Sequence, residues 1–141
     1  MSDLFLQSLR RRNDIDITVR GKSGHAAYPH TTVDPLVAAA YLVTQLQTVV
    51  TREVNAMHPA VVTVGAIQGG TTYNIIPDSC LIKGTVRTLH ARARDVAEAA
   101  IKRFAEGMTG TMRVTCEVSY RRGVPPLVNH DRVLDPTIAA V

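Results

Sequence analysis

The chain contains little aromatic surface and no tryptophan. Aromatic residues make up 4% of its 141 residues, whereas hydrophobic residues make up 45% and charged residues 20%. The core must therefore be built from Val, Ile, Leu and Ala, and few rings are available to stack on nucleic-acid bases. This balance is typical of a folded globular protein and argues against disorder. The length fits one domain.

Long apolar runs are also absent, and cysteine is scarce. No run reaches the ~18 residues that a membrane-spanning helix needs. The charges of Arg10–Arg12 follow a very short apolar patch, which is the reverse of the order in a secretory signal. The two cysteines, Cys80 and Cys116, lie in predicted strands and form no Cys-x-x-Cys pair, which is typical of buried free thiols. We therefore expect a cytoplasmic protein with no membrane partner.

Hydrophobic periodicity predicts an α+β fold. Alternating patterns predict strands over residues 14–20, 60–67, 78–89 and 112–121, and helical patterns predict helices over 34–50 and 91–108, with Gly110 as a break. The order βαββαβ predicts a ferredoxin-like domain, with a four-stranded antiparallel sheet and two helices on one face. This fold serves catalytic, regulatory and RNA-binding modules, so it does not decide the function.

Each predicted helix has an apolar stripe. Asp34 and Pro35 provide an N-cap and a first-turn proline for the first helix. Its apolar periodicity runs through Leu36, Val37, Ala40, Val43, Leu46, Gln47 and Val50. The buried stripe of the second helix is predicted to be Ala93, Val96, Ala97, Ala100, Ile101, Phe104 and Met108.

Two histidines, His25 and His30, lie in the Gly- and Pro-rich loop that follows the first strand. A zinc site needs three or four ligands, and no cysteine or carboxylate with ligand spacing accompanies them, so we predict no metal in this chain. His25 has small neighbours and could donate to a developing oxyanion, although spacing alone favours an exposed loop histidine. We expect His30 to cap local backbone groups.

A second loop, Gly69–Asn74, and a strand arginine complete the candidate residues. The loop has no Lys-Ser/Thr after its glycines and no helix follows, so a phosphate-binding loop is a weak match. The glycines instead favour a tight loop that brings the Asn74 amide into a shared space. Arg87 could bind a substrate carboxylate as a fork, or it could be an ordinary exposed strand arginine.

Three separated segments resemble the zinc-dependent amidohydrolase family of hippurate hydrolase, auxin-conjugate amidohydrolases, succinyl-diaminopimelate desuccinylase and carboxypeptidase G. They are G-K-S-G-H-A-A-Y-P-H-T-T-V-D-P at 21–35, V-T-V-G-A-I-Q-G-G-T-T-Y-N-I-I-P-D at 62–78 and G-T-V-R-T-L at 84–89. They occur in the family's order and spacing, and the resemblance covers about residues 14–130. It is to the family's small lid and dimerisation domain.

The resemblance implies a role for each candidate residue. His25 would reach the partner subunit's active site and stabilise the tetrahedral oxyanion, while Asn74 and Arg87 would hold the substrate, an N-acyl amino acid. The family also implies a homodimer, which we expect to form through the sheet edge and the first helix. Zinc or another divalent metal would be bound by a larger catalytic domain.

No H-x-D, Glu-Glu pair or late metal-binding histidine of that larger domain occurs in this chain. We therefore expect residues 1–13 to be an irregular extension, residues 14–121 to be the lid and dimerisation domain, and residues 122–141 to be a linker. The linker would end in the start of a helix at Asp135–Pro136 that belongs to the missing catalytic domain. Alone, the chain should not hydrolyse a substrate.

The alternative hypothesis is a free-standing ferredoxin-like module that binds RNA or a small regulatory ligand. An RNA-binding sheet would expose aromatic rings on its central strands, whereas the third strand offers Lys83, Thr85 and Arg87. The net charge of +4 and the pI near 9.4 are mild, and the basic residues are more typical of solvated faces. We therefore expect no nucleic-acid partner.

Overall fold

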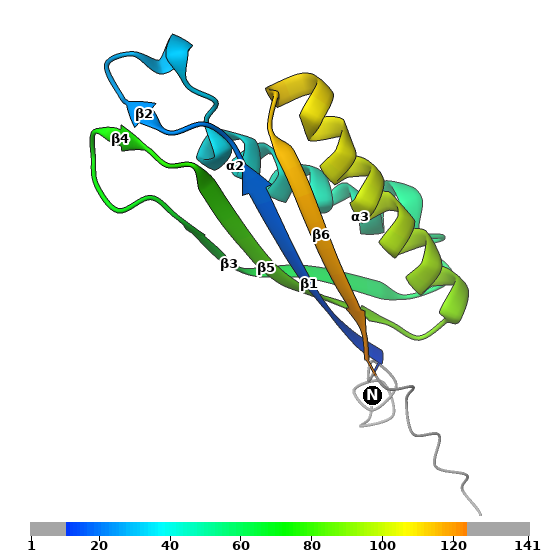
Figure 1. Cartoon of the computed structure of the whole chain (residues 1–141). Coiled ribbons are helices and arrows are strands. Elements are labelled where there is room, and N and C mark those ends of the chain that lie inside the picture. Colours follow the sequence, from blue (N-terminus) through cyan, green and yellow to red (C-terminus); the bar gives the residue numbers. More distant parts are fainter. Residues whose placement is uncertain (1–10, 124–141) are drawn as a thin grey trace, which may run out of the picture.

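Four long strands, each of which places apolar side chains on one face, pair into an antiparallel sheet (Figure 1). The computed structural model describes residues 11–123. The strands are β1 (Arg11–Arg20), β3 (Ala60–Gly69), β5 (Ser79–Thr88) and β6 (Thr115–Arg122), and their order across the sheet is β3-β5-β1-β6. This arrangement confirms the ferredoxin-like α+β prediction.

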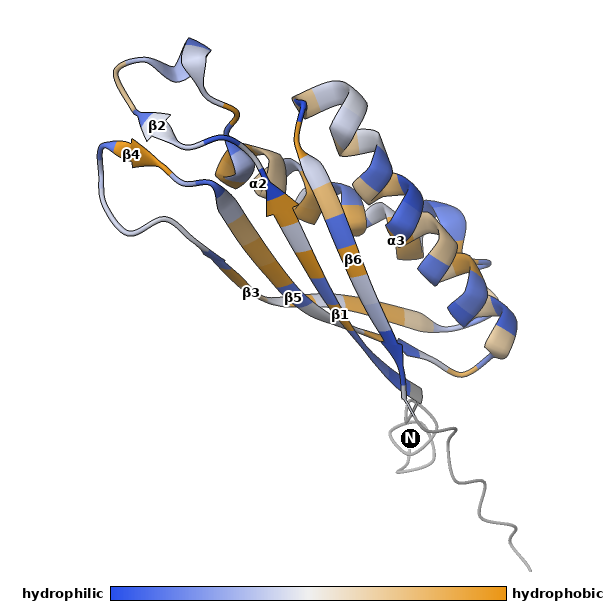
Figure 2. Cartoon of the chain, in the orientation of Figure 1, coloured by the Kyte–Doolittle hydropathy of each residue, from blue (hydrophilic) through white to orange (hydrophobic). Residues whose placement is uncertain are grey.

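The two helices, α2 (Pro35–Leu46) and α3 (Ala91–Met112), cover one face of the sheet (Figure 1). The strands alternate apolar and polar residues along their length (Figure 2). Ile15, Ile17 and Val19 of β1 point toward the helices and are fully buried. The opposite face of the sheet is polar and no helix covers it, which is usual for an antiparallel sheet.

The buried stripe of α2 differs from the periodicity that the sequence favoured. The structure buries Pro35, Ala38, Ala39, Leu42 and Leu46, whereas Val37, Ala40 and Gln47 are exposed. The helix is apolar around most of its circumference, so periodicity alone could not identify the buried face. After α2 the chain makes a π-helical turn, η2 (Val49–Glu53), which buries Val49 and leaves Val50 only partly covered.

The end of α3 corrects a second prediction. The helix continues through Gly110 to Met112, and Arg113 ends it with a left-handed backbone at φ 62°. A helical glycine costs only about 1 kcal/mol relative to alanine, and Met108 and Met112 continue the stripe that faces the core. Met112, which was predicted to begin the fourth strand, therefore belongs to the helix, and β6 begins at Thr115.

The first strand begins at Arg11, so residues 11–13, predicted as irregular, lie in β1. Asn13 is buried, and its side-chain amide donates to the Val86 carbonyl at 3.0 Å. A buried polar residue with a backbone partner gave no apolar signal in the sequence. The predicted helix start at Asp135–Pro136 lies outside the described residues.

The two edges of the sheet differ. The edge strand β3 has a bulge between Val64 and Ala66, where its register against β5 shifts. The edge strand β6 carries ion pairs, including Arg20–Glu117 at 3.1 Å and Asp16–Arg121 at 2.7 Å.

No helix in residues 11–123 is both long and apolar enough to cross a membrane.

Candidate functional site

The loops that carry His25 and Asn74 pair with each other beyond one end of the sheet. Short strand β2 (Gly24–His25) lies antiparallel to β4 (Ile75–Ile76), and His25 is in register with Ile75. The Ala26 amide donates to the Asn74 carbonyl at 2.9 Å. We call these loops, residues 22–31 and 70–77, the paired-loop tip (Figure 1). It brings two candidate residues, far apart in the sequence, into one place.

Local sequence explains why the tip folds this way. A Cβ atom at Gly24 would lie 2.5 Å from Thr32 Cγ2, so only glycine fits there. Gly70 adopts φ 74°, a conformation that glycine accepts without strain. A short 3-10 turn, η1 (Pro29–Thr31), follows β2, and the Thr32 hydroxyl donates to the Pro29 carbonyl at 2.8 Å.

The His25 side chain is exposed, and one of its ring nitrogens has a backbone partner. The Ala27 amide donates to His25 Nδ1 at 3.1 Å. Because Nδ1 accepts this hydrogen bond, the proton of the neutral imidazole is on Nε2. The ring is therefore oriented with its Nε2–H available as a donor to a group outside this domain.

Asn74 is exposed, and its side-chain amide makes no hydrogen bond to the rest of residues 11–123. His30 lies in η1, where its ring contacts Tyr28 at a centroid distance of 6.4 Å. The backbone groups around η1 are bonded by Thr31 and Thr32 and by the backbone itself, so the expected His30 cap has no counterpart in the turn.

Three exposed apolar side chains at the tip were missed by sequence reasoning. The exposed fraction is 60% for Tyr28, 106% for Tyr73 and 43% for Ile75. Tyr28 also contacts the His25 ring, with centroids 6.0 Å apart. All three residues lie close to His25 or Asn74 in the sequence, and this closeness could have identified them.

Arg87 lies at the opposite end of the sheet. It is exposed on the face without helices, in register with Arg12 of β1 and Val61 of β3. At the usual rise of a strand, the residues from Ser79 to Arg87 span about 26 Å. One copy of the domain therefore brings His25 and Asn74 together and keeps Arg87 away from both.

A comparison with protein families gives the identity of this fold. Residues 9–110 match the family model of the peptidase dimerisation domain. The chain belongs to this family. The dimerisation domain is 38% identical over 117 residues to N-acetyl-L-cysteine deacetylase of Bacillus subtilis (strain 168), a match that covers 83% of the chain and 28% of that protein.

Solved structures of related enzymes contain the same domain. A protein of methicillin-resistant Staphylococcus aureus described as an aminohydrolase superposes with a TM-score of 0.81 at 35% identity, covering 92% of the chain and 34% of that protein. A dinuclear metal-binding peptidase of Bacillus subtilis superposes with a TM-score of 0.65 at 27% identity, covering 92% and 31%. The chain thus spans about a third of the length of these relatives.

The described part of the dimerisation domain offers no ligand set for such metals. Residues 11–123 contain no group of three or more His, Cys, Asp or Glu side chains placed to hold a metal ion. The residues present do not fit a dinuclear site, and no chemical step through a metal can be derived from them.

A second surface of the dimerisation domain is apolar and exposed. Val37 and Tyr41 of α2 are 45% and 61% exposed, and Ile67 of the neighbouring edge strand β3 is 47% exposed. Between α2 and β3 lies a groove of about 560 Å³ that is lined by Val43, Gln47 and residues 62–67. We call Val37, Tyr41, Ile67 and this groove the α2–β3 patch. Exposed apolar patches mark interaction sites in many proteins.

Proposed function

We propose that this domain pairs the subunits and closes the active sites of a metal-dependent amidohydrolase that cleaves N-acyl amino acids. The separation of its functional residues carries this proposal: His25 and Asn74 lie at one end of the sheet and Arg87 lies at the other. In this arrangement the metal ions, zinc or another divalent ion, belong to a catalytic domain contributed by the rest of a full-length enzyme.

The α2–β3 patch is the proposed dimer interface. An exposed edge strand beside an exposed apolar helix face can meet its own copy about a two-fold axis and extend the sheet. Antiparallel pairing of two β3 strands places Ala60 at one end of β3 beside Gly69 of the partner. The end of the sheet that carries Arg87 then lies beside the paired-loop tip of the partner.

This geometry supports an assignment of the residues to different subunits at each active site. The start of β1 and the end of β6 lie beside Arg87, because Arg12 is in register with Arg87 and Asn13 with Arg122. Connections to a flanking catalytic domain would therefore leave from the Arg87 end. Arg87 would act in its own subunit's site, whereas His25 and Asn74 would act in the partner's site.

The side chains suit the proposed chemistry. The His25 Nε2–H would donate a hydrogen bond to the oxyanion of the tetrahedral intermediate, where charge develops. The Asn74 amide can both donate and accept, so it can hold the substrate amide. The Arg87 guanidinium can bind the substrate carboxylate with two parallel hydrogen bonds. The chain alone should have no hydrolytic activity.

Subunit mixing tests this assignment. In a full-length enzyme built by joining this domain to the catalytic domain of a relative, His25→Ala and Arg87→Gln should each abolish most activity. In a mixed dimer, one site would have both residues intact and the other would have neither. Mixing equal amounts of the two inactive variants should therefore restore about a quarter of wild-type activity.

Failure to restore activity, with mixed dimers demonstrated by mass spectrometry, would contradict the assignment to different subunits. Restoration by mixing His25→Ala with Asn74→Ala is not expected, because both residues would act in the same site. This second mixture is the matched control.

The remaining expectations follow the same proposal. Cys80 and Cys116 are free thiols, which fits the reducing cytoplasm.

The alternative role in RNA binding is disfavoured by the face of the sheet without helices. There Lys83, Thr85 and Arg87 of β5 have no aromatic neighbour on the described strands. An electrophoretic gel-shift at physiological salt should show no specific RNA complex.

A further inference from the structure

Two arginines lie directly opposite each other at the end of the sheet that carries Arg87. Arg12 of β1 is the cross-strand partner of Arg87 of β5, and both are exposed on the face without helices. Like charges placed directly opposite on antiparallel strands repel each other. A negative charge near such a pair reduces this repulsion.

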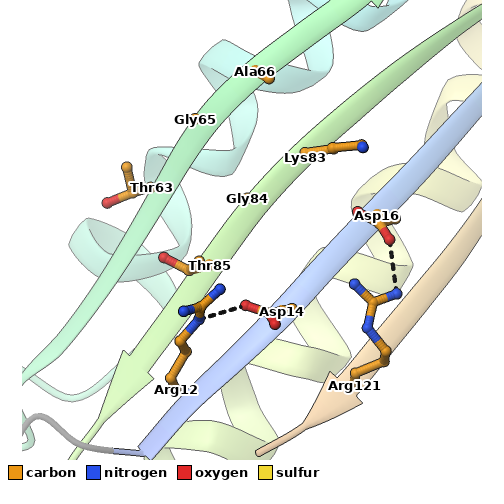
Figure 3. Close-up of a pocket in the computed structure, with 10 residues that line it drawn as sticks. All are labelled: Arg12, Asp14, Asp16, Thr63, Gly65, Ala66, Lys83, Gly84, Thr85 and Arg121. Atoms are coloured by element: carbon orange, nitrogen blue, oxygen red, sulfur yellow. Dashed lines mark hydrogen bonds and ion pairs between the residues drawn. The ribbon is translucent and has the colours of Figure 1, made fainter.

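The protein compensates only one of the two charges. Arg12 Nε donates to Asp14 Oδ1 at 2.8 Å (Figure 3), and its terminal nitrogens make no other hydrogen bond within residues 11–123. The Arg87 side chain has no ion pair or hydrogen bond within the same residues, and its other cross-strand neighbour is the apolar Val61. Arg87 therefore keeps an uncompensated positive charge.

Beside Arg12, on the same face of the sheet, lies an open hollow that Arg87 does not line. It has a volume of about 400 Å³ and is lined by side chains from all four long strands, among them Arg12, Thr85 and Lys83. Figure 3 shows the Arg12 guanidinium beside Thr85. The other carboxylate of the hollow, Asp16, is occupied by Arg121 at 2.7 Å. The Asp14 bond fixes the Arg12 Nε and leaves the terminal nitrogens for a ligand.

We propose that Arg12 and Arg87 together form a two-guanidinium site for the carboxylate of the N-acyl amino acid substrate. This inference rests on the proposed function and adds Arg12 as a second substrate-positioning residue. Arg87 contributes the uncompensated charge, and Arg12, oriented by Asp14, contributes further N–H donors from the neighbouring strand. A planar guanidinium matches a carboxylate better than a lysine ammonium does.

The test is an NMR titration of the 141-residue chain with N-acetylglycine at constant ionic strength. Backbone amides at the start of β1 and the end of β5 should shift in a saturable way, and the neutral probe N-acetylglycinamide should leave them unshifted. Arg12→Gln and Arg87→Gln should each raise the apparent Kd by at least about threefold. Arg12→Lys should recover only part of the affinity.

Two controls separate binding from structure. Asp14→Asn breaks the same ion pair as Arg12→Gln but keeps the positive charge of Arg12, so it should weaken N-acetylglycine binding less than Arg12→Gln does. Arg92→Gln removes an exposed arginine of α3 that has no ion pair within residues 11–123, and it should leave the Kd unchanged.

Two outcomes would overturn the inference. If Arg12→Gln binds N-acetylglycine like the wild type while Arg87→Gln does not, Arg87 acts alone and the proposed function stands. If the wild type shows no carboxylate-dependent shift at this end of the sheet, the two-guanidinium site is wrong. The subunit-mixing experiment then still decides the proposed function independently.

Discussion

At the paired-loop tip, backbone hydrogen bonds and glycines hold His25 and Asn74 in place, whereas at the other end of the sheet the arginines are sorted by ion pairs. Arg122 is bound by Glu98 at 2.7 Å, and Arg12 by Asp14, but Arg87 is free of such partners in residues 11–123. Both ends thus present groups that the domain itself does not satisfy. In the proposed dimer, the two ends are complementary halves of a site that a single copy does not assemble.

The largest effect is expected from a substitution that separates the two subunits of the proposed dimer. Tyr41→Asp places a charge in the α2–β3 patch, and a two-fold interface contains the substitution twice. The dimer dissociation constant should rise by more than about 100-fold, with the fold intact by circular dichroism because Tyr41 is 61% exposed. Sedimentation velocity measures this. Ala99→Asp on α3 is the control, and an unchanged dimer for Tyr41→Asp would rule out the proposed interface.

Gly24→Ala should damage only the tip. Its Cβ would meet Thr32 Cγ2 at 2.5 Å, and overpacking of this kind costs about 1–3 kcal/mol. Hydrogen exchange should accelerate for the amides of residues 22–31 and 70–77, while those of the central strands remain protected. Gly65→Ala is the matched control, since the nearest contact there is Lys83 O at 4.0 Å. Global loss of protection would show that the tip is not separable.

Glu98→Gln tests the ion pairs at the arginine end. Burial raises the Glu98 pKa, but the hydrogen bonds from Lys102 and Arg122 outweigh it and hold the pKa below its ordinary value of 4.5. A lowered carboxyl pKa stabilises the fold above pH 4.5, and this contribution is lost as the pH falls through the folded-state pKa. The variant should lose about 1–2 kcal/mol at pH 7 in urea unfolding. The wild-type advantage should shrink at pH 3, and a constant difference would contradict this pKa shift.

The smallest effect sharpens the description of α3, which ends beside the tip. Gly110 is helical and a Cβ there meets nothing within 4 Å. Gly110→Ala should therefore raise the free energy of unfolding by about 0.5–1 kcal/mol. Thermal and urea unfolding measure it. Destabilisation would mean that Gly110 ends the helix after all.

Much of the fold could be predicted because the apolar pattern of the strands is local. The alternation of Ile15, Ile17 and Val19 identified β1, and Asp34, which accepts hydrogen bonds from the Leu36 and Val37 amides, was recognisable as an N-cap. The buried face of α2 was not predictable, because a helix that packs on its own sheet and exposes a second apolar face has two valid stripes.

The candidate site was only partly visible in the sequence. The family motifs pointed to His25, Asn74 and Arg87, but the pairing of β2 with β4 joins segments about 50 residues apart and depends on tertiary structure. The opposition of Arg12 and Arg87 is likewise a matter of strand register. No local pattern around Arg12 could have revealed its neighbour on β5.

The unlike edges of the sheet decide how far assembly can proceed. In the proposed dimer the apolar-flanked edge β3 receives another strand, whereas β6 is bordered by the charges of Glu117 and Arg121 and their ion-pair partners. A sheet with two receptive edges could add copies without limit and grow into a filament. With a single receptive edge, growth of a sheet shared in this way would stop at the dimer, however high the protein concentration.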